Sequence, residues 1–450
     1  MKSLDRDILR LALPSIVSNI TVPLLGLCDV TIMGHVGGAV HIGAIAVGSM
    51  IFNVMYWLFV FLRMSTSGLT AQAYGARRWQ ATQHLLWRGL TVALSFGLAI
   101  VVLQVPLRWL TFWMLQAEGE VAALCTPYYH ICVWGAPAVL GLYVLMGWLV
   151  GMQNTRLPMM IAIGQNVVNI ALSLVLVIGF DMGIRGVALG TVVAQWAGFL
   201  AGILRVKGIV KREQGTGNSE KFATVFQTIR RAAANFSLFT IHCSLKNLHF
   251  SLNLNIFLRT LCLVSVNLYF TSAGAAQGAL ILAANTLLMQ FFMFYSYIMD
   301  GFANAGEALS GRYVGAADQP MLQQTVRRLF GWGCAVAMLF TVAYALVGTP
   351  LLRLMTSDAS VVATARVFLP WAVLIPVAGM AAFVWDGIFI GTTLSRGMLV
   401  SCFWAAAAFF GLWFALSPLA GNHALWIALL TYLAMRGLLQ TMIWKRNGRQ

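Results

Sequence analysis

Long apolar stretches recur from one end of this chain to the other, and they constrain its fold more than any other feature. Each is about 18 residues or longer, enough to cross a bilayer core of about 30 Å as a helix. We predict spans at 11–33, 42–63, 88–112, 128–150, 158–180, 184–204, 254–272, 276–302, 329–350, 366–391, 397–417 and 423–443. With 60% hydrophobic and only 9% charged residues, the chain has too little charge to cover a soluble domain. The pattern predicts an all-α membrane protein with about twelve transmembrane helices.

The distribution of basic residues argues against nucleic-acid binding, although 29 Lys and Arg outnumber 13 Asp and Glu. With a cytoplasmic N-terminus and alternating helices, the basic residues near outward connections are Arg108, Arg185, Arg353 and Arg366. The rest fall at the termini or at inward connections. This positive-inside bias predicts that both termini lie in the cytoplasm. We expect a multi-pass protein of the bacterial inner membrane.

Signals for cofactors and catalysis are weak in this sequence. The seven cysteines show no CxxC pair and no metal-ligand spacing, and we find no phosphate-binding Gly loop followed by Lys-Ser/Thr. We therefore expect no metal, no cofactor, no catalytic residues and no enzyme activity. The expected partners are the lipid bilayer and small amphipathic substrates, with the chain acting as a monomer.

The two halves of the chain repeat at an offset of 240 residues (387 − 147). GWLVGMQNTR at 147–156 matches GIFIGTTLSR at 387–396, and ALGTVVA at 188–194 matches ALLTYLA at 428–434. AYGA at 73–76 lies over YVGA at 313–316 at the same offset. An even number of helices in each half gives a parallel repeat, related by a pseudo-two-fold axis along the membrane normal. Such repeats are typical of secondary transporters.

A polar stretch at 205–235 separates six predicted helices from six. We expect an N-terminal six-helix lobe at 1–204, a cytoplasmic linker at 205–253 and a C-terminal six-helix lobe at 254–450.

The first helix carries the strongest candidate for cation coupling, Asp29, within PLLGLCDVTIMGHVGG. A carboxylate deep in hydrocarbon is costly and is a functional hypothesis by default. Desolvation favours its neutral form, so the residue could load and release a proton. Pro14 and Pro23 lack backbone N–H groups and are predicted to let the helix bend. The alternative is an acid near the outer interface that holds the Gly34–Gly37 turn.

The fifth helix carries Asn166, Asn169 and Ser173 at spacings of three and four, so they share one face. This face could bond to the Asp29 carboxylate or coordinate a cation, or it could serve only helix–helix contact. Ser173 and Met33, one turn beyond Asp29, are candidates for the substrate pocket.

The second half has acids of its own. Asp386 begins an Asp-Gly pair that the repeat aligns with Met146-Gly147, and it serves either cation coupling or helix bending. Asp300 and Glu307 flank the expected inner end of span 276–302. They could form a charge network with Arg259 or Arg312, unless Arg259 extends to the membrane interface.

Several blocks together resemble the MATE (multidrug and toxic compound extrusion) family, within it the DinF-like, DNA-damage-inducible branch. They are NITVPLLGLCDVTIMGHVG, FLRMSTSGLTAQAYGA, LRT at 258–260, DGFANAGEALSGRYVGA, WDGIFIG and GNHALWIAL. The resemblance implies a twelve-helix, two-lobe exporter of organic cations or other toxic amphiphiles in exchange for H⁺ or Na⁺. It also implies that Asp29 couples to the cation beside Asn166 and Asn169, that Pro14 marks the bend, and that Asp386 couples in the second lobe.

Two departures from the family pattern stand out. Many members carry Asp where this chain has Ser173, so a first-lobe sodium site with two carboxylates is not available. Leu254 and Asn255 stand where a charged Arg-Asp pair is expected, and the stretch 235–252 also differs.

The sequence thus predicts a cation-coupled antiporter, with H⁺ favoured over Na⁺. A flippase for lipid-linked precursors is the main alternative, and it would need a strongly cationic cavity. A membrane-embedded enzyme would need converging His, Asp or Ser groups. A non-transporting scaffold would leave Asp29 without consequence.

Overall fold

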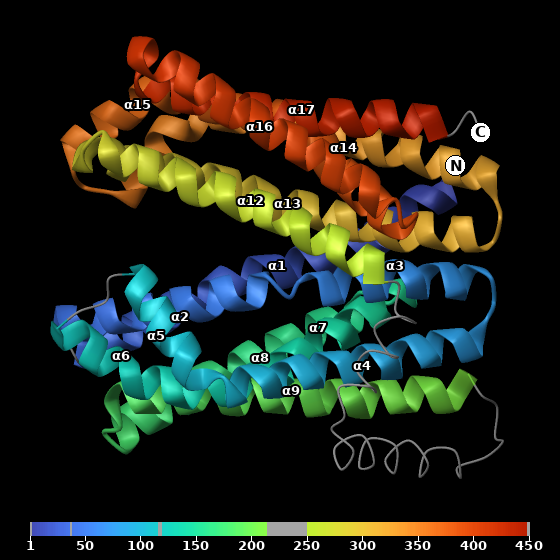
Figure 1. The fold of residues 1–450 in the computed structure, drawn as a ribbon, viewed down its shortest axis with the longest axis horizontal. Helices are drawn as coiled ribbons and strands as arrows, with labels where there is room; N and C mark the ends of the chain where they lie inside the picture. Colours follow the sequence, from blue (N-terminus) through green and yellow to red (C-terminus); the bar gives the residue numbers. More distant parts are fainter. Residues whose placement is uncertain (1, 37, 116–118, 214–249, 448–450) are drawn as a thin grey trace. The chain divides into compact units, whose positions relative to one another are not determined.

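The computed structural model describes residues 2–36, 38–115, 119–213 and 250–447, and every element in these ranges is a helix (Figure 1). The helices before the central gap are α1 (Lys2–Val36), α2 (Gly38–Trp57), α3 (Phe61–Gly75), α4 (Trp79–Val102), α5 (Gln104–Leu115), α6 (Gly119–Cys132), α7 (Ala136–Gly151), α8 (Arg156–Leu174) and α9 (Gly183–Glu213). Those after it are α12 (Phe250–Ala276), α13 (Ala279–Gly315), α14 (Gln319–Met355), α15 (Ala359–Gly391), α16 (Ser395–Ala420) and α17 (Asn422–Asn447). A 3₁₀ turn, η1 (Val133–Gly135), precedes α7, and a π-helical turn, η2 (Val175–Gly179), follows α8.

Eleven helical segments in the described part are long and apolar enough to cross a membrane. The chain is a multi-pass membrane protein, as predicted. Several predicted spans differ in detail. Span 88–112 is interrupted, because α4 ends at Val102 and α5 begins at Gln104, and span 42–63 crosses the break between α2 and α3. Span 276–302 ends too early, since α13 continues to Gly315.

The extension of α13 follows from small residues that let it approach α15 closely. Ala305, Gly306 and Gly311 are buried, and an added Cβ on Gly391 of α15 would overlap with the backbone of Glu307. The hydropathy pattern predicts an end of α13 that is too early. The segment after residue 302 is buried by close contact with another helix, and not because its side chains are strongly apolar. Asp300 therefore lies in the middle of α13, and not at its end as predicted.

The chain packs as two compact units, one of residues 20–253 and the other of residues 1–19 with 254–450. We call them the N-terminal lobe and the C-terminal lobe. The sequence-based division placed residues 1–19 in the first lobe and began the linker at 205, whereas α9 continues to Glu213. The contacts of Asp5 explain why residues 1–19 belong to the C-terminal lobe. Its carboxylate accepts a hydrogen bond from Trp332 Nε1 at 3.2 Å and lies 3.7 Å from Arg328 Nη1, and both of these residues are on α14.

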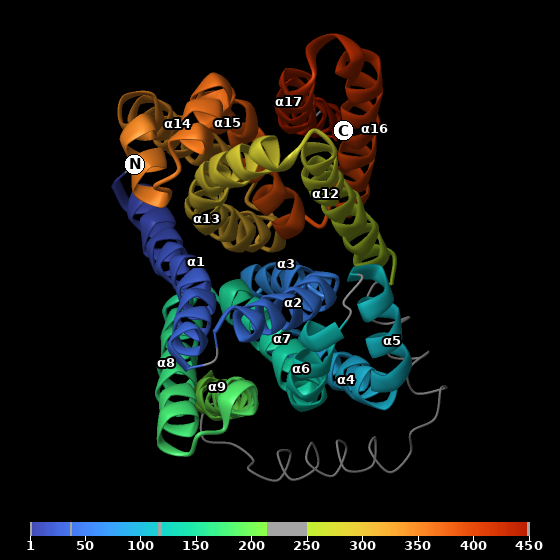
Figure 2. The same ribbon diagram turned by 90° about the vertical axis from the view of Figure 1, so that its left-hand side faces the viewer.

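Equivalent helices pack in equivalent ways within each lobe. In the N-terminal lobe α7 packs against α3 and α4, and α8 packs against α9. In the C-terminal lobe α15 packs against α13 and α14, and α16 packs against α17. Figure 2 shows α13, α14 and α15 gathered together within their lobe. The six-helix lobes are thus built on one plan.

The turns confirm the 240-residue repeat at single positions. Arg77 follows α3 with φ 55°, and Ala317 follows α13 with φ 53°. Gln153 and Thr393, after α7 and α15, have φ 60° and 57°. Non-glycine residues rarely adopt this left-handed conformation, so its recurrence at matching positions reflects a shared backbone path.

Close helix contacts repeat at the same offset. A Cβ on Gly147 would overlap with the backbone of Arg63, and one on Gly387 would overlap with the backbone of Ala303. Both pairs of residues are related by the repeat, so the contact between the paired helices is the same in each lobe.

Candidate functional site

Helix α1 passes from one lobe to the other between Asn19 and Ile20. It is helical throughout, including at Pro14 and Pro23, the two positions predicted to bend it. Pro23 has no N–H, so the helix bond that would reach the Asn19 carbonyl is missing at this junction. Asn19 Nδ2 donates to the Tyr297 carbonyl of α13 at 3.0 Å, within the C-terminal lobe. Bending at the prolines stays a prediction.

On the other side of the junction, α1 is tied to α8. Asn166 Nδ2 donates to the Thr21 carbonyl at 3.1 Å, and both residues belong to the N-terminal lobe. This bond brings the predicted polar face of α8 against α1 at Thr21, eight residues before Asp29. The side chains of Asp29 and Met33 lie outside the described residues, although both positions belong to α1.

The polar face of α8 also reaches α9. Asn169 Nδ2 donates to Thr191 Oγ1 at 3.0 Å, and the Thr191 hydroxyl donates to the Val187 carbonyl at 2.9 Å. Asn169 is 1% exposed and Ser173 is 0% exposed, so the predicted face is a buried helix contact. Sequence reasoning missed Thr191. The sequence offers little indication of its role, because a single threonine in an apolar span is common.

Two oxygen atoms of this face have unused hydrogen-bonding capacity. Within the described residues, Asn169 Oδ1 and Ser173 Oγ are buried with no hydrogen-bond partner. They stand one helical turn apart on α8, and Gly190 of α9 lies against Ser173, since an added Cβ there would be 2.6 Å from Oγ. Buried polar atoms normally find a partner, so this pair is suited to a water molecule, a proton donor or a small cation.

The C-terminal lobe holds a buried ion cluster around Asp386 on α15. Its Oδ2 accepts from Arg259 Nη2 of α12 and, at 2.6 Å, from Arg436 Nη2 of α17. Its Oδ1 accepts from Gln440 Nε2 at 2.8 Å. All four side chains are buried. The cluster joins three helices that lie far apart in the sequence.

Arg436 and Gln440 were missed by the sequence reading. Arg436 was counted among the basic residues near inward connections, yet it is 6% exposed and stacks over the Tyr432 ring at 5.4 Å. The available signal was the spacing of four residues from Tyr432 to Arg436 to Gln440, which places them on one face of α17.

Arg259 was expected to pair with Asp300 or Glu307, and the structure pairs it with Asp386. Glu307 is buried on α13, and Arg312 lies against the Tyr313 ring at 5.6 Å. A network that includes Asp300 and Glu307 stays a prediction. At the Leu254-Asn255 departure, Asn255 Nδ2 donates to Ser395 Oγ of α16 at 3.1 Å, a neutral contact between two helices. Residues 235–249 of the other departing stretch lie outside the described residues.

The two guanidinium groups limit what Asp386 can do chemically. Charge-assisted bonds of this kind are strong, and Arg is permanently charged. A cation arriving at Asp386 would meet these two positive charges. The positions related to these four residues by the repeat are Asn19, Met146, Trp196 and Leu200, all uncharged.

Comparisons with known proteins support one family. The MatE family model matches residues 14–175 and 255–417, once in each half. The chain is 39% identical to DNA damage-inducible protein F of Escherichia coli over 450 residues, covering 100% of this chain and 94% of that protein. It is 24% identical to a probable multidrug resistance protein NorM of Thermotoga maritima, covering 79% of this chain and 73% of that one.

Solved structures share the fold. The bent form of the Vibrio cholerae MATE transporter VcmN matches with a TM-score of 0.82 at 21% identity, covering 99% of this chain and 97% of that one. A MOP superfamily transporter from Pyrococcus furiosus matches with a TM-score of 0.79 at 18% identity, covering 98% and 95%. Its description reports a binding pocket of reversed polarity in that protein. The family match in both halves and the full-length relative lead to one conclusion: this chain belongs to the MATE family of multidrug and toxic compound efflux transporters.

Proposed function

We propose that this transporter is a cation-coupled antiporter that exchanges H⁺, in preference to Na⁺, for amphipathic organic cations or other toxic small molecules. We place the coupling site in the N-terminal lobe, at Asp29 with Asn166, Asn169, Ser173 and Thr191. One observation carries the proposal: α8 presents two buried oxygen atoms, Asn169 Oδ1 and Ser173 Oγ, that have no hydrogen-bond partner in the described part of the chain, beside Thr191.

The register of α1 against α8 supports the inclusion of Asp29. They are the first and fifth membrane crossings, so both run in the same direction. The Asn166 bond sets Thr21 level with Asn166. Asp29 lies eight residues after Thr21, and Leu174 lies eight residues after Asn166. Eight residues of helix rise about 12 Å, so Asp29 comes level with the turn of α8 that ends at Leu174. Asp29 thus shares its depth with Ser173.

The ligand set favours a proton over sodium. A hard metal cation prefers several oxygen ligands with enough negative charge to replace its hydration shell. The proposed site has one carboxylate, two amides and two hydroxyl groups, because Ser173 stands where many family members carry Asp. A proton needs only the Asp29 carboxylate, with the neighbouring amides and hydroxyls as hydrogen-bond partners.

Proton loading at Asp29 would act on the helix that belongs to both lobes. In this mechanism, substrate enters from the cytoplasm or the inner leaflet, and protonation of Asp29 removes a charge from α1 and reshapes it beyond the Pro23 junction. The substrate is then released outside. Each charge that moves down the membrane potential supplies about 2.3 kcal/mol per 100 mV.

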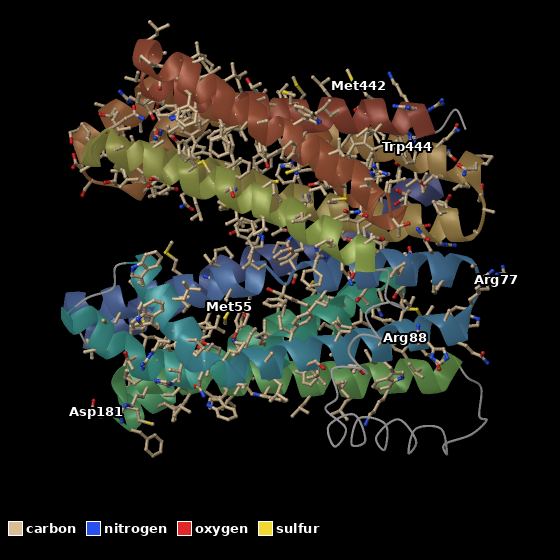
Figure 3. All side chains as sticks on the ribbon, viewed as in Figure 1. Met55, Arg77, Arg88, Asp181, Met442 and Trp444 are labelled. Carbon is tan, nitrogen blue, oxygen red and sulfur yellow. The ribbon has the colours of Figure 1, made fainter. Side chains whose placement is uncertain are left out.

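Asp386 has a structural role in this proposal, because Arg259 and Arg436 already occupy its carboxylate. Their engagement also weighs against a flippase for lipid-linked precursors, which needs unpaired cationic groups to hold a pyrophosphate. Figure 3 labels Arg77 and Asp181 at opposite ends of the N-terminal lobe. The positive-inside rule assigns the Arg77 end to the cytoplasm of a bacterial inner membrane.

Transport by proteoliposomes tests the proposal. Vesicles carrying wild type, Asp29→Asn or Asp181→Asn would be loaded with ethidium, and efflux would be driven by a pH gradient or by a sodium gradient. Asp181 lies in an exposed turn of the same lobe, so its variant is the matched control. We expect pH-driven efflux by wild type and Asp181→Asn, and the rate of empty vesicles for Asp29→Asn.

Two outcomes would overturn the assignment. Sodium-driven efflux that survives Asp29→Asn would move coupling toward Asp386. Absence of efflux under either gradient, with folded protein, would reject ethidium export and bring the flippase forward.

A further inference from the structure

Aromatic side chains from three helices meet at the end of the C-terminal lobe where α14 begins and α17 ends. The ring centroids of Phe330 on α14 and Trp385 on α15 are 5.0 Å apart, and those of Trp385 and Trp444 on α17 are 5.2 Å apart. Trp385 Nε1 also donates to Thr441 Oγ1 of α17 at 2.7 Å. We call Phe330, Trp385 and Trp444, which is labelled in Figure 3, the aromatic patch. Its central ring is held by α14 and by α17.

Two exposed cations flank the aromatic patch. Arg327 lies three residues before Phe330 on α14, and Lys445 lies four residues after Thr441 on α17. Each cation therefore stands one helical turn beyond a residue that contacts Trp385, and both stand on the side of the patch that faces this end of the lobe. Among the residues that the structure describes, neither Arg327 nor Lys445 has an ion-pair partner.

The acids near these helix ends leave the two cations uncompensated. Asp5 pairs with Arg328, whose side chain leaves α14 about 100° around the helix from that of Arg327. Asp386 follows Trp385 in the sequence, but it is shared by two buried guanidinium groups. Asp318 caps the first turn of α14, nine residues before Arg327, where it accepts from a backbone N–H group. The flanks of the patch are therefore positive.

On the other side of the patch, toward the middle of the membrane span, α15 exposes apolar side chains. Leu374 lies three turns before Trp385 on the same face of α15, and Val377 follows one turn after Leu374. Both are exposed, as are Met338 on α14 and Leu438 on α17. The order along the lobe is thus cations, then aromatic rings, then an apolar surface, which is the order of parts in a phospholipid.

The other lobe lacks this arrangement. The positions related by the repeat to the aromatic patch are Leu90, Leu145 and Leu204, and the position related to Arg327 is Trp87. Equivalent helices pack together there without aromatic rings. The shared backbone plan therefore does not require the patch, which points to a use specific to the C-terminal lobe.

We propose that Arg327, Lys445 and the aromatic patch bind one anionic phospholipid of the cytoplasmic leaflet. The phosphate group accepts hydrogen bonds from the guanidinium of Arg327 and the ammonium of Lys445, and an acyl chain lies along the exposed face of α15. Basic residues at the inner surface attract anionic headgroups, and tryptophan rings favour the headgroup level. The inference uses the membrane orientation given by the positive-inside rule and is independent of the coupling site.

A lipid bound here would brace α14 and α17 against α15 beside the ion cluster. Trp385 precedes Asp386, and Thr441 follows Gln440, so the patch and the cluster lie on neighbouring residues of the same two helices. A ligand that binds only the folded state stabilises it by mass action. Phosphatidylglycerol should therefore raise the unfolding temperature of wild type more than phosphatidylcholine does.

Native mass spectrometry of the purified full-length chain tests the site. Protein in detergent would be titrated with dioleoyl phosphatidylglycerol or dioleoyl phosphatidylcholine, and the dissociation constant of the first bound lipid would be measured. We expect tighter binding of phosphatidylglycerol. Arg327→Gln and Lys445→Gln should each weaken it about 5-fold, and the double variant about 25-fold. The charge-conserving pair Arg327→Lys and Lys445→Arg should keep most of the affinity.

Arg396→Gln is the matched control, with the folding of every variant checked by thermal unfolding. Arg396 is exposed at the beginning of α16, which packs against α17 through Gly397 and Ile443, away from the aromatic patch. This variant should bind phosphatidylglycerol as wild type does.

Three results would overturn the proposal. The first is equal phosphatidylglycerol affinity in wild type and the folded double variant. The second is a loss in Arg396→Gln as large as in Arg327→Gln, which would show attraction by general surface charge. The third is displacement of the lipid by an equal concentration of glycerol phosphate, which would make this a site for a soluble phosphate.

Discussion

The two lobes share a backbone plan and differ in what they bury. Around α8 and α9, the N-terminal lobe buries amides and hydroxyls, and Asn169 Oδ1 and Ser173 Oγ have no partner among the described residues. The C-terminal lobe buries two guanidinium groups on one carboxylate. A site with unused acceptors can take up a ligand, whereas a carboxylate shared by two arginines is already occupied. The same scaffold thus carries a neutral polar face in one lobe and a buried charged cluster in the other, and the proposed coupling site rests on this contrast.

The energetics of burial explain why this division is stable. Removing one member of a buried ion pair leaves an uncompensated charge, while a neutral buried acceptor without a partner costs only about 1–3 kcal/mol. The C-terminal cluster therefore favours a fixed arrangement of α12, α15 and α17. The N-terminal lobe can leave two neutral acceptors open for a ligand at a lower cost.

The largest effect should come from breaking the C-terminal cluster. Asp386→Asn leaves two buried guanidinium groups without their carboxylate and should destabilise the protein by about 3–5 kcal/mol. Thermal unfolding of the detergent-solubilised protein measures this loss. Arg353→Gln, an exposed arginine in the last turn of α14, should change stability little and is the control. Equal stability of Asp386→Asn and wild type would show that the cluster does not hold the lobe.

Matched glycine substitutions test the shared plan. Gly147→Ala and Gly387→Ala should each destabilise the protein by about 2 kcal/mol, because the new Cβ would overlap with the backbone of the paired helix. Gly411→Ala is the control, since nothing lies within 4 Å of its added Cβ. Unfolding midpoints should fall by similar amounts in the two variants. A loss in one lobe alone would contradict equivalent packing.

A smaller effect is expected at the proposed coupling site. Thr191→Val removes the acceptor for Asn169 Nδ2 and should lower stability by about 1 kcal/mol. It should also slow pH-driven efflux, because Asn169 loses its orientation. Thr191→Ser keeps the hydroxyl and should behave as wild type in both assays. Slow efflux in both variants would argue against a role for the hydroxyl group.

The smallest effect concerns the N-cap of α15 at the end of the C-terminal lobe. Hydrogen bonds from the Ser360 hydroxyl and from the backbone N–H groups of Ser360 and Val361 hold the pKa of Asp358 below its ordinary value. A depressed pKa adds stability above the unfolded value, and this stability is lost as pH falls through the folded value. The advantage of wild type over Asp358→Asn should therefore be present at pH 7 and shrink below about pH 4. An advantage that does not change with pH would contradict the charged cap.

Much of the fold could be predicted from the sequence, because helix length, apolar character and the 240-residue repeat are local or periodic signals. The polar face of Asn169 and Ser173 could be found in the same way, from its spacing. Contacts between residues that lie far apart in the sequence could not be predicted. Arg259, Asp386 and Arg436 lie 127 and 50 residues apart along the chain, and their convergence depends on tertiary packing. The extension of α13 was missed because small residues, not hydropathy, bury it. The role of Asp29 stays a prediction.

Proton counting tests most directly the central claim that the coupling cation binds in the N-terminal lobe and not at Asp386. Purified protein in weakly buffered solution would be mixed with ethidium, and released protons would be measured with a pH dye in wild type, Asp29→Asn and folded Asp386→Asn. We expect proton release by wild type and by Asp386→Asn, and none by Asp29→Asn. Release that persists in Asp29→Asn and disappears in Asp386→Asn would contradict it.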